Sequence, residues 1–263
     1  MSKHHETISI SKSYHDTVEV YGRHFLKIVG VVLIPHVISY LLFTSLSASV
    51  ISGFARLASA SEFFTFSNIN FDISLMLLLL IMVIELLGLA ALVYMVTHNE
   101  RVTLLTAFEH ALEFFWRYLV YGLALLVVSA IGLVIGYLII TIVSILFGFF
   151  SIELLNSAFI WMDTIVPFIT TSLLSAFFVF AMFSIVDRNS TVNEAMRHSF
   201  HMVKGHYWPV CIRLAIVYVL VYLLGYVLQF IPGVGNLISA LILVPFVVVY
   251  LHTLYRDLVS LNQ

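Results

Sequence analysis

Charged side chains are scarce in this chain of 263 residues, and cysteine is almost absent. Only 10% of the residues are Asp, Glu, Lys or Arg, whereas 62% are hydrophobic. A soluble domain carries about 25% charged residues, so most of this surface must face something other than water. The single cysteine, Cys211, excludes an internal disulfide and any metal site built from several cysteines. A net charge of −2 provides no general basic field for nucleic acid.

Six apolar stretches are long enough to cross a bilayer, which requires about 20 residues of helix. They are Phe25–Ser49, Ile73–Thr97, Tyr118–Phe149, Ile165–Val186, Trp208–Phe230 and Leu237–Leu258. The third is too long for one straight crossing, so we expect it to tilt or to extend beyond the bilayer. The sequence therefore predicts an all-α, polytopic membrane protein in which residues 1–263 form a single integral membrane domain.

Lysine and arginine are divided unequally between the two sides that these spans define. One side collects eleven of the twelve, and only Arg56 falls on the other. Cytoplasmic segments carry an excess of Lys and Arg, so we expect both termini in the cytoplasm and the chain in the cell (plasma or inner) membrane. Trp116 and Trp208 open spans three and five at the inner face, where amphipathic rings are favoured.

The segments before spans one, three and five carry apolar residues at helical spacing. These are Tyr14, Val18, Tyr21 and Phe25; Leu104, Phe108, Ala111, Leu112 and Phe115; and Val192, Met196, Phe200 and Val203. Such helices lie in the membrane interface or pack on neighbouring spans, and the spacing fits both. Thr191 and Glu194 are placed as a capping box for the third helix.

These three segments lie about 90 residues apart, which is the period of a repeated unit. The chain reads as three parallel pseudo-repeats, roughly 9–97, 99–186 and 189–258, each with one cytoplasmic interfacial helix and one transmembrane hairpin. Because every repeat contains two crossings, all three have the same orientation, unlike the inverted repeats of many transporters.

Four short motifs near the end of the chain carry a family resemblance. They are Asn193-Glu-Ala-Met-Arg-His-Ser199, Met202-Val-Lys-Gly-His-Tyr-Trp208, Ile231-Pro-Gly-Val-Gly235, and Pro245 followed by Leu254-Tyr-Arg-Asp257. With the span pattern, they resemble a family of six-span bacterial and archaeal membrane proteins related to the membrane domain of glycerophosphoryl diester phosphodiesterases. The resemblance implies fold and topology alone. The enzymatic members act through a separate soluble barrel domain, for which these extramembrane segments are too short, so no catalytic residue is carried over.

Glu85 is the most informative polar residue, because it lies near the middle of the predicted span Ile73–Thr97. A carboxylate at that depth must be protonated, paired or in contact with a wet cavity. It is either a proton or cation site or a neutral, hydrogen-bonded group that fixes helix packing. Arg213 is expected to extend to the inner headgroups, since pairing with Glu85 would need a shift in depth. His36 and His252 complete the candidate intramembrane polar site, although such histidines are more often packed than functional.

His198, His201 and His206 form the one histidine group with ligand-like spacing. His198 and His201 share a helix face, but no third ligand is positioned, so we expect no metal site. The chain has no nucleophile elbow and no phosphate-binding glycine loop, so we expect neither an enzyme nor a cofactor. Gly132 and Gly136 form a motif of small residues that indicates close helix approach, within the chain or between protomers.

The function class that the sequence favours is a non-enzymatic multi-pass membrane protein that organises lipid or a membrane partner. Candidate contacts for anionic headgroups of the inner leaflet are Arg101, Arg117, Arg188, Arg197, Lys204, Trp116 and Trp208. A homo-oligomer fits the same reasoning, whereas a nucleic-acid partner does not. The alternative is a small-molecule, ion or lipid transporter that uses Glu85 as its coupling site and needs a polar cavity reaching it.

Overall fold

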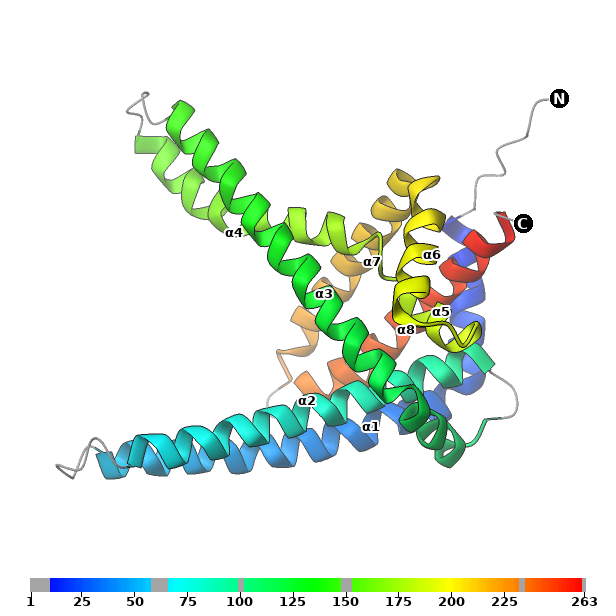
Figure 1. Ribbon diagram of the computed structural model, residues 1–263, viewed down its shortest axis with the longest axis horizontal. Helices are drawn as coiled ribbons and strands as arrows, with labels where there is room; N and C mark the ends of the chain where they lie inside the picture. Colours follow the sequence, from blue (N-terminus) through cyan, green and yellow to red (C-terminus); the bar gives the residue numbers. More distant parts are fainter. Residues whose placement is uncertain (1–9, 58–65, 99–101, 148–152, 232–234, 262–263) are drawn as a thin grey trace. The chain divides into compact units, whose positions relative to one another are not determined.

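The described residues of this protein are helical. A computed structural model describes residues 10–57, 66–98, 102–147, 153–231 and 235–261, shown in Figure 1. The helices are α1 (Ile10–Leu57), α2 (Phe66–His98), α3 (Leu104–Phe147), α4 (Glu153–Ser175), α5 (Ala181–Asp187), α6 (Val192–Lys204), α7 (Tyr207–Leu228) and α8 (Gly235–Leu261). Five of them contain a segment long and apolar enough to cross a membrane, in α1, α2, α3, α7 and α8. The predicted all-α membrane class is therefore confirmed for the described ranges.

Two of the expected surface helices are continuous with the spans that follow them. α1 has 48 residues and α3 has 44, so they are about 72 and about 66 Å long at 1.5 Å per residue. Both exceed the hydrocarbon thickness of about 30 Å, as the long third span indicated. In the predicted third repeat, α6 and α7 are separate helices. The chain turns at Gly205 and His206, and Pro209, which has no N–H to donate to the Gly205 carbonyl, lies in the first turn of α7.

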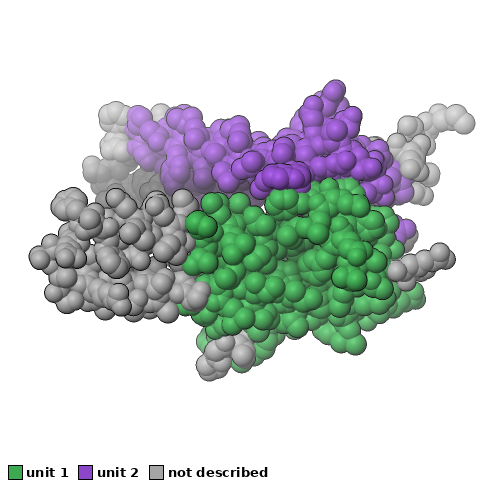
Figure 2. All heavy atoms as spheres, turned by 60° about the horizontal axis from the view of Figure 1, so that its bottom comes forward, with its two compact units in different colours: residues 1–115, 221–253 green, residues 116–220, 254–263 purple. Residues whose placement is uncertain are grey.

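The contacts of the chain divide it into two compact units, coloured separately in Figure 2. Unit 1 comprises residues 1–115 and 221–253, and unit 2 comprises residues 116–220 and 254–263. α3, α7 and α8 each contribute residues to both units. The boundaries do not follow the predicted repeats 9–97, 99–186 and 189–258, so the repeats remain a prediction.

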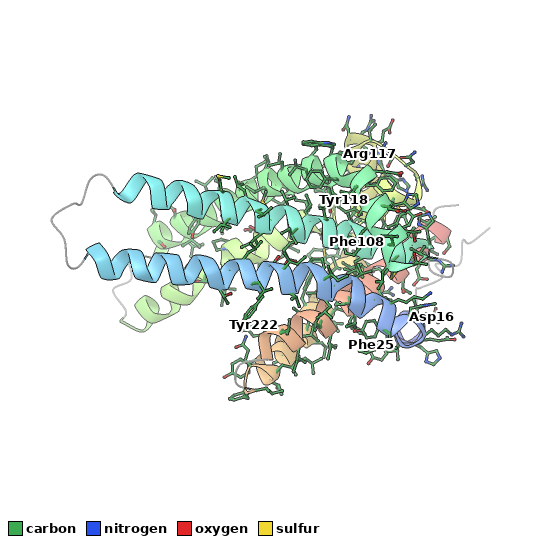
Figure 3. All side chains as sticks on the ribbon, turned by 90° about the horizontal axis from the view of Figure 1, so that it is seen from below. Asp16, Phe25, Phe108, Arg117, Tyr118 and Tyr222 are labelled. Carbon is green, nitrogen blue, oxygen red and sulfur yellow. The ribbon has the colours of Figure 1, made fainter. Side chains whose placement is uncertain are left out.

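Unit 1 is built on the antiparallel α1–α2 hairpin, in which the two helices run side by side (Figure 1). α8 packs on the N-terminal part of α1, where Figure 3 places Asp16 and Phe25. The Tyr21 hydroxyl donates a hydrogen bond to the Ile242 carbonyl at 3.1 Å. The rings of Tyr14 and Tyr21 both meet the Phe246 ring edge to face. Part of the first amphipathic stripe therefore packs on another helix.

Unit 2 contains a second hairpin, formed by α3 and α4, and it settles the role of the small-residue motif. A Cβ on Gly132 would lie 2.6 Å from the Thr171 Cα, and one on Gly136 would overlap the Pro167 backbone. The Thr170 hydroxyl donates to the Gly132 carbonyl at 2.8 Å. Of the two alternatives left open by the sequence, the close helix approach within the chain is the one observed.

The fourth expected span, Ile165–Val186, is not one helix. α4 ends at Ser175, residues 176–180 form turns, and α5 begins at Ala181. The expectation of a continuous helix was wrong because the stretch contains no glycine, and its one proline, Pro167, lies inside α4 rather than at the break. The apolar part of α4 with described side chains, Thr164–Ser175, is shorter than a span.

Side-chain hydroxyls satisfy backbone carbonyls at and around this interruption. Tyr207 donates to the Leu173 carbonyl, Ser199 to Phe177, Tyr121 to Phe178 and Tyr118 to Met182, at 2.8 to 3.2 Å. α3, which carries Tyr118 next to Arg117 (Figure 3), thus holds the break together with α6 and α7. Non-helical backbone is tolerated at membrane depth when protein groups satisfy it in this way.

Candidate functional site

Glu85 and His36 are in contact within the α1–α2 hairpin. The His36 Nδ1 lies 3.2 Å from the Glu85 Oε2. Along the apolar segment of α2 from Met76 to His98, Glu85 is about 14 Å from one end and about 20 Å from the other at 1.5 Å per residue. The Glu85 carboxyl is therefore far from the polar groups at both ends of this segment, and its titratable partner is His36.

A close crossing of the two helices brings this pair together. A Cβ on Gly88 would lie 2.6 Å from the Pro35 Cγ, so only a residue without a side chain fits there. Gly88 follows Glu85 by three residues and Pro35 directly precedes His36, which places both ionisable groups at the crossing. Pro35 also lacks the N–H that would otherwise bond to the Val31 carbonyl in the preceding turn. The backbone is therefore more polar here than in an uninterrupted helix.

The pair is not sealed into the interior of unit 1. The exposed fraction of the side chain is 26% for His36 and 36% for Glu85. Ser39, which shares the helix face of His36, is 7% exposed, and its Oγ has no hydrogen-bond partner among the described residues. Tyr40 and Phe43 continue that face outward and are 59% and 58% exposed. An imidazole, a carboxyl and an unpaired hydroxyl thus lie beside an exposed aromatic stripe.

A second His–Glu pair in unit 1 provides a contrast. His110 Nδ1 lies 3.0 Å from Glu113 Oε2, in the first turns of α3, with exposed fractions of 40% and 67%. The Tyr94 ring stacks on His110 on one side and on His98 on the other, with centroids 4.5 and 4.3 Å away. Glu113 follows His110 by three positions in the same helix, so no second helix is needed to bring the two side chains together. The two pairs have the same chemistry in different surroundings.

Arg213 and His252, the other two residues of the candidate intramembrane site, are both buried. Arg213 is 6% exposed and lies on the buried face of α7 with Val210, Leu214 and Val217. Its side chain is therefore packed against protein, and its extension to the headgroups stays a prediction. His252 on α8 is 9% exposed, as expected for a packed histidine.

His198, His201 and His206 lie in and directly after α6, near the α6–α7 junction in unit 2. His198 Nε2 and His206 Nδ1 are buried without a hydrogen-bond partner in the described part of the chain. Burial lowers the pKa of His198, and the positive charges of Arg188 and His201 lower it further against the opposing effect of Asp187. Among the described residues, no three His, Cys, Asp or Glu side chains are grouped as a metal site requires.

α6 has the predicted capping box, and its buried face overlaps the predicted stripe only at Val203. The Thr191 hydroxyl accepts a hydrogen bond from the Glu194 N–H, and the Glu194 carboxylate accepts one from the Thr191 N–H. The hydrogen bonds that the Glu194 carboxylate accepts from the Thr191 N–H and from the Thr191 hydroxyl hold the pKa of Glu194 below its ordinary value. The buried residues are Ala195, Ser199, Met202 and Val203. Val192, Met196 and Phe200 of the stripe are half-buried beside them, so α6 packs on protein rather than lying free in the interface.

Most of the candidate headgroup contacts belong to unit 2. Arg188, Arg197 and Lys204 are exposed, and Trp116 and Trp208 are 70% and 66% exposed. Arg117 is half-buried and donates a hydrogen bond to the Asn189 Oδ1. Arg101 lies outside the described residues, as does the Pro232–Val234 part of the predicted turn between the last two spans.

A surface hollow of about 590 Å³ lies on α3 in unit 2, lined by Tyr137, Ile140, Thr141, Ser144 and Ile145. Neither Glu85 nor His36 lines it, so it is not the polar cavity that the transporter alternative requires. Comparison with known proteins adds no assignment, because no family model, no curated protein and no solved structure matches this chain.

Proposed function

We propose that this chain is a membrane transporter whose α1–α2 hairpin binds a proton at the Glu85–His36 pair. The contact between the two side chains at 3.2 Å is the observation that carries the proposal. Ionisable residues inside membrane spans are rare and mark proton relays or ion pathways more often than other polar residues do. The sequence favoured the organisation of lipid or a partner because of its many predicted interfacial helices, its few buried charges and the lack of a catalytic constellation. The burial of Ala195, Ser199, Met202 and Val203 of α6 against protein weakens the first of these reasons.

The chemistry of the pair suits proton binding. With one proton shared between them, His36 and Glu85 are neutral overall, whether the proton resides on the imidazole or the carboxyl. Loss of that proton leaves a net charge of −1, and a second proton gives +1. A charge at the bilayer centre costs about 3 kcal/mol on insertion scales, so the singly protonated pair is the favoured state. A site of this kind releases its proton only when another positive charge compensates the negative charge that is left. Coupled transport requires this dependence.

Infrared spectroscopy of the protein in lipid vesicles tests whether Glu85 carries such a proton. We expect a pH titration of the wild-type protein to show a carboxylic-acid carbonyl band, at a frequency typical of an apolar environment, that is missing from Glu85→Gln. Glu113→Gln is the matched control, because Glu113 has the same kind of partner but is exposed. If the bands lost in the two variants have the same frequency and titrate together, Glu85 is an ordinary hydrated carboxyl and the proposal fails.

The proposal also includes the number of membrane crossings and the side on which the termini lie. We place six crossings in the cell membrane, with both termini in the cytoplasm, and relate the chain to the six-span family that its terminal motifs resemble. The fourth crossing would consist of α4 and α5 joined through the 176–180 turns. The hydroxyl donors around those turns support it, because they satisfy backbone groups that lipid could not.

The second candidate function is the one that the sequence favoured, the organisation of anionic lipid. Its support is the exposure of Arg188, Arg197, Lys204, Trp116 and Trp208 within unit 2. Each basic residue near an anionic surface contributes about 1 kcal/mol. We expect native mass spectrometry from a mild detergent to retain anionic phospholipid on the wild-type protein and to lose it when Arg197 and Lys204 are both changed to alanine. Equal retention by the variant would remove this candidate.

A further inference from the structure

We infer that the Glu85–His36 site exchanges its proton for a lipophilic monovalent ammonium cation. This inference rests on the proposed function and names its substrate class. The observations behind it are the partly exposed carboxyl, the unpaired Ser39 hydroxyl, and the aromatic stripe that continues from His36 on the same face of α1.

Charge balance selects a monovalent cation. When the pair gives up its proton, His36 is neutral and Glu85 is a carboxylate, which leaves one uncompensated negative charge in an apolar setting. One monovalent cation restores neutrality, so one proton leaves as one cation binds and no net charge is moved into the site. A divalent cation would leave a net charge of +1, and an anion would increase the charge to −2. Both are disfavoured by the same energy that disfavours the empty deprotonated site.

The groups around Glu85 suit an ammonium better than a metal ion. Hard cations take six or more oxygen ligands, as Ca²⁺ and Mg²⁺ do. Among the described side chains near the crossing, the oxygen ligands available to a metal ion are the Glu85 carboxyl and the Ser39 hydroxyl, and His36 adds an imidazole. Ser39 is 7% exposed, and its Oγ is enclosed and unpaired among the described residues. A large organic cation needs a counter-ion and little further coordination.

Aromatic rings next to the carboxyl provide the second element of ammonium recognition. Tyr40 and Phe43 follow His36 by four and seven residues, so they lie on the same helix face, one and two turns further along α1. Both rings are more than half exposed. An ammonium over the face of an aromatic ring is attracted by the negative charge of that face, most strongly where water is excluded. A lipophilic cation would therefore be held between the carboxyl and the ring of Tyr40.

The groups that can titrate near Glu85 are few. From α1 they are His36, in direct contact, and Tyr40, one turn away. On α2, residues 73–93 contain no other acidic, basic or tyrosine side chain. A pH dependence of cation binding that disappears with Glu85 is therefore a property of the pair.

Calorimetric titration with benzyltrimethylammonium tests the inference on the full chain in nanodiscs of neutral phosphatidylcholine. This quaternary cation has no proton of its own, so any proton released on binding comes from the protein. We expect release of one proton per cation, measured from buffers of different ionisation enthalpy, and an affinity that rises about tenfold per pH unit while the pair is protonated. Neopentylbenzene, the uncharged molecule of the same shape, should show no pH-dependent binding.

Four variants separate the contributions of the carboxyl and of the aromatic ring to cation binding. Glu85→Gln should lower cation affinity at least tenfold and abolish proton release, whereas Glu113→Gln should leave both as in the wild type. Tyr40→Leu should weaken binding several-fold, and Tyr40→Phe should retain it, since the ring and not the hydroxyl makes the contact. Wild-type affinity in both Glu85→Gln and Tyr40→Leu would overturn the inference. Displacement of the organic cation by Na⁺ at equal concentration would also overturn the substrate class.

The infrared titration distinguishes failure of the substrate class from failure of the proposed function. If the Glu85 carboxylic-acid band is present and benzyltrimethylammonium does not bind, the substrate class is wrong and proton binding stands. If that band is absent and His36 carries no proton that Glu85→Gln removes, the proposed function and the inference fail together.

Discussion

Gly136→Ala should destabilise the protein by about 2–3 kcal/mol, the range for overpacking a tight contact that cannot relax. The added Cβ would overlap the Pro167 backbone, and a backbone atom of a packed helix cannot rotate away as a side chain does. The same clash should separate α3 from α4 and weaken the hydrogen bond from Thr170 to the Gly132 carbonyl. The midpoint of thermal or denaturant unfolding in detergent, followed by circular dichroism, measures the change.

Gly122→Ala is the control in the same helix. A Cβ on Gly122 meets nothing within 4 Å, and alanine is favoured over glycine in a helix interior by about 1 kcal/mol. We therefore expect Gly122→Ala to be neutral or slightly stabilising. If the two substitutions have the same effect, the α3–α4 contact does not exist in the form described.

His36→Leu should destabilise the α1–α2 hairpin, because it leaves the Glu85 carboxyl without its partner. Removing one member of a fully buried ion pair costs about 3–5 kcal/mol. The carboxyl can take up a proton instead of remaining an unpaired charge, which reduces the expected loss to about 1–2 kcal/mol at neutral pH. The free energy of unfolding in detergent or bicelles measures it.

The double variant His36→Leu/Glu85→Gln tests the reason for this loss. An amide carries no charge, so the second substitution should restore much of the stability that the first removes. His110→Leu at the exposed pair with Glu113 should have a small effect, within about 0.5 kcal/mol. A double variant less stable than His36→Leu alone would show that the imidazole acts through packing and not through the carboxyl.

The sequence predicted those features that depend on local spacing. The capping box of Thr191 and Glu194 needs only residues three apart, and it is observed. The motif of Gly132 and Gly136 indicated a close helix contact, although periodicity could not identify the partner. Glu85 was recognised because charge is rare in an apolar helix, whatever surrounds it.

The features that the sequence did not predict depend on contacts between distant segments. His36 precedes Glu85 by 49 positions in the numbering, and its role follows from the Pro35–Gly88 crossing, for which no local pattern exists. The break at residues 176–180 is stabilised by hydroxyls of Tyr118, Tyr121 and Ser199 from other helices. Ser39 was overlooked because a serine in a helix usually bonds to its own backbone, and here its Oγ has no partner among the described residues.

The burial of Arg213 was not predicted for a related reason. Its position along the span does not state which face of the helix it occupies. Arg213 lies on the face that Val210 and Val217 bury. A guanidinium on that side packs inward even though its stem is long enough to reach a headgroup.

The most direct test of the account is nuclear magnetic resonance of the protein in lipid bilayers, with ¹³C-labelled glutamate and ¹⁵N-labelled histidine. The Glu85 carboxyl carbon and the His36 Nδ1 would be assigned from Glu85→Gln and His36→Leu and followed as a function of pH. If the two side chains share one proton, both signals change in the same pH step, and each variant shifts the step of the remaining partner. Two independent steps, each unchanged by removal of the other side chain, would contradict the central claim that Glu85 and His36 form one proton-binding site.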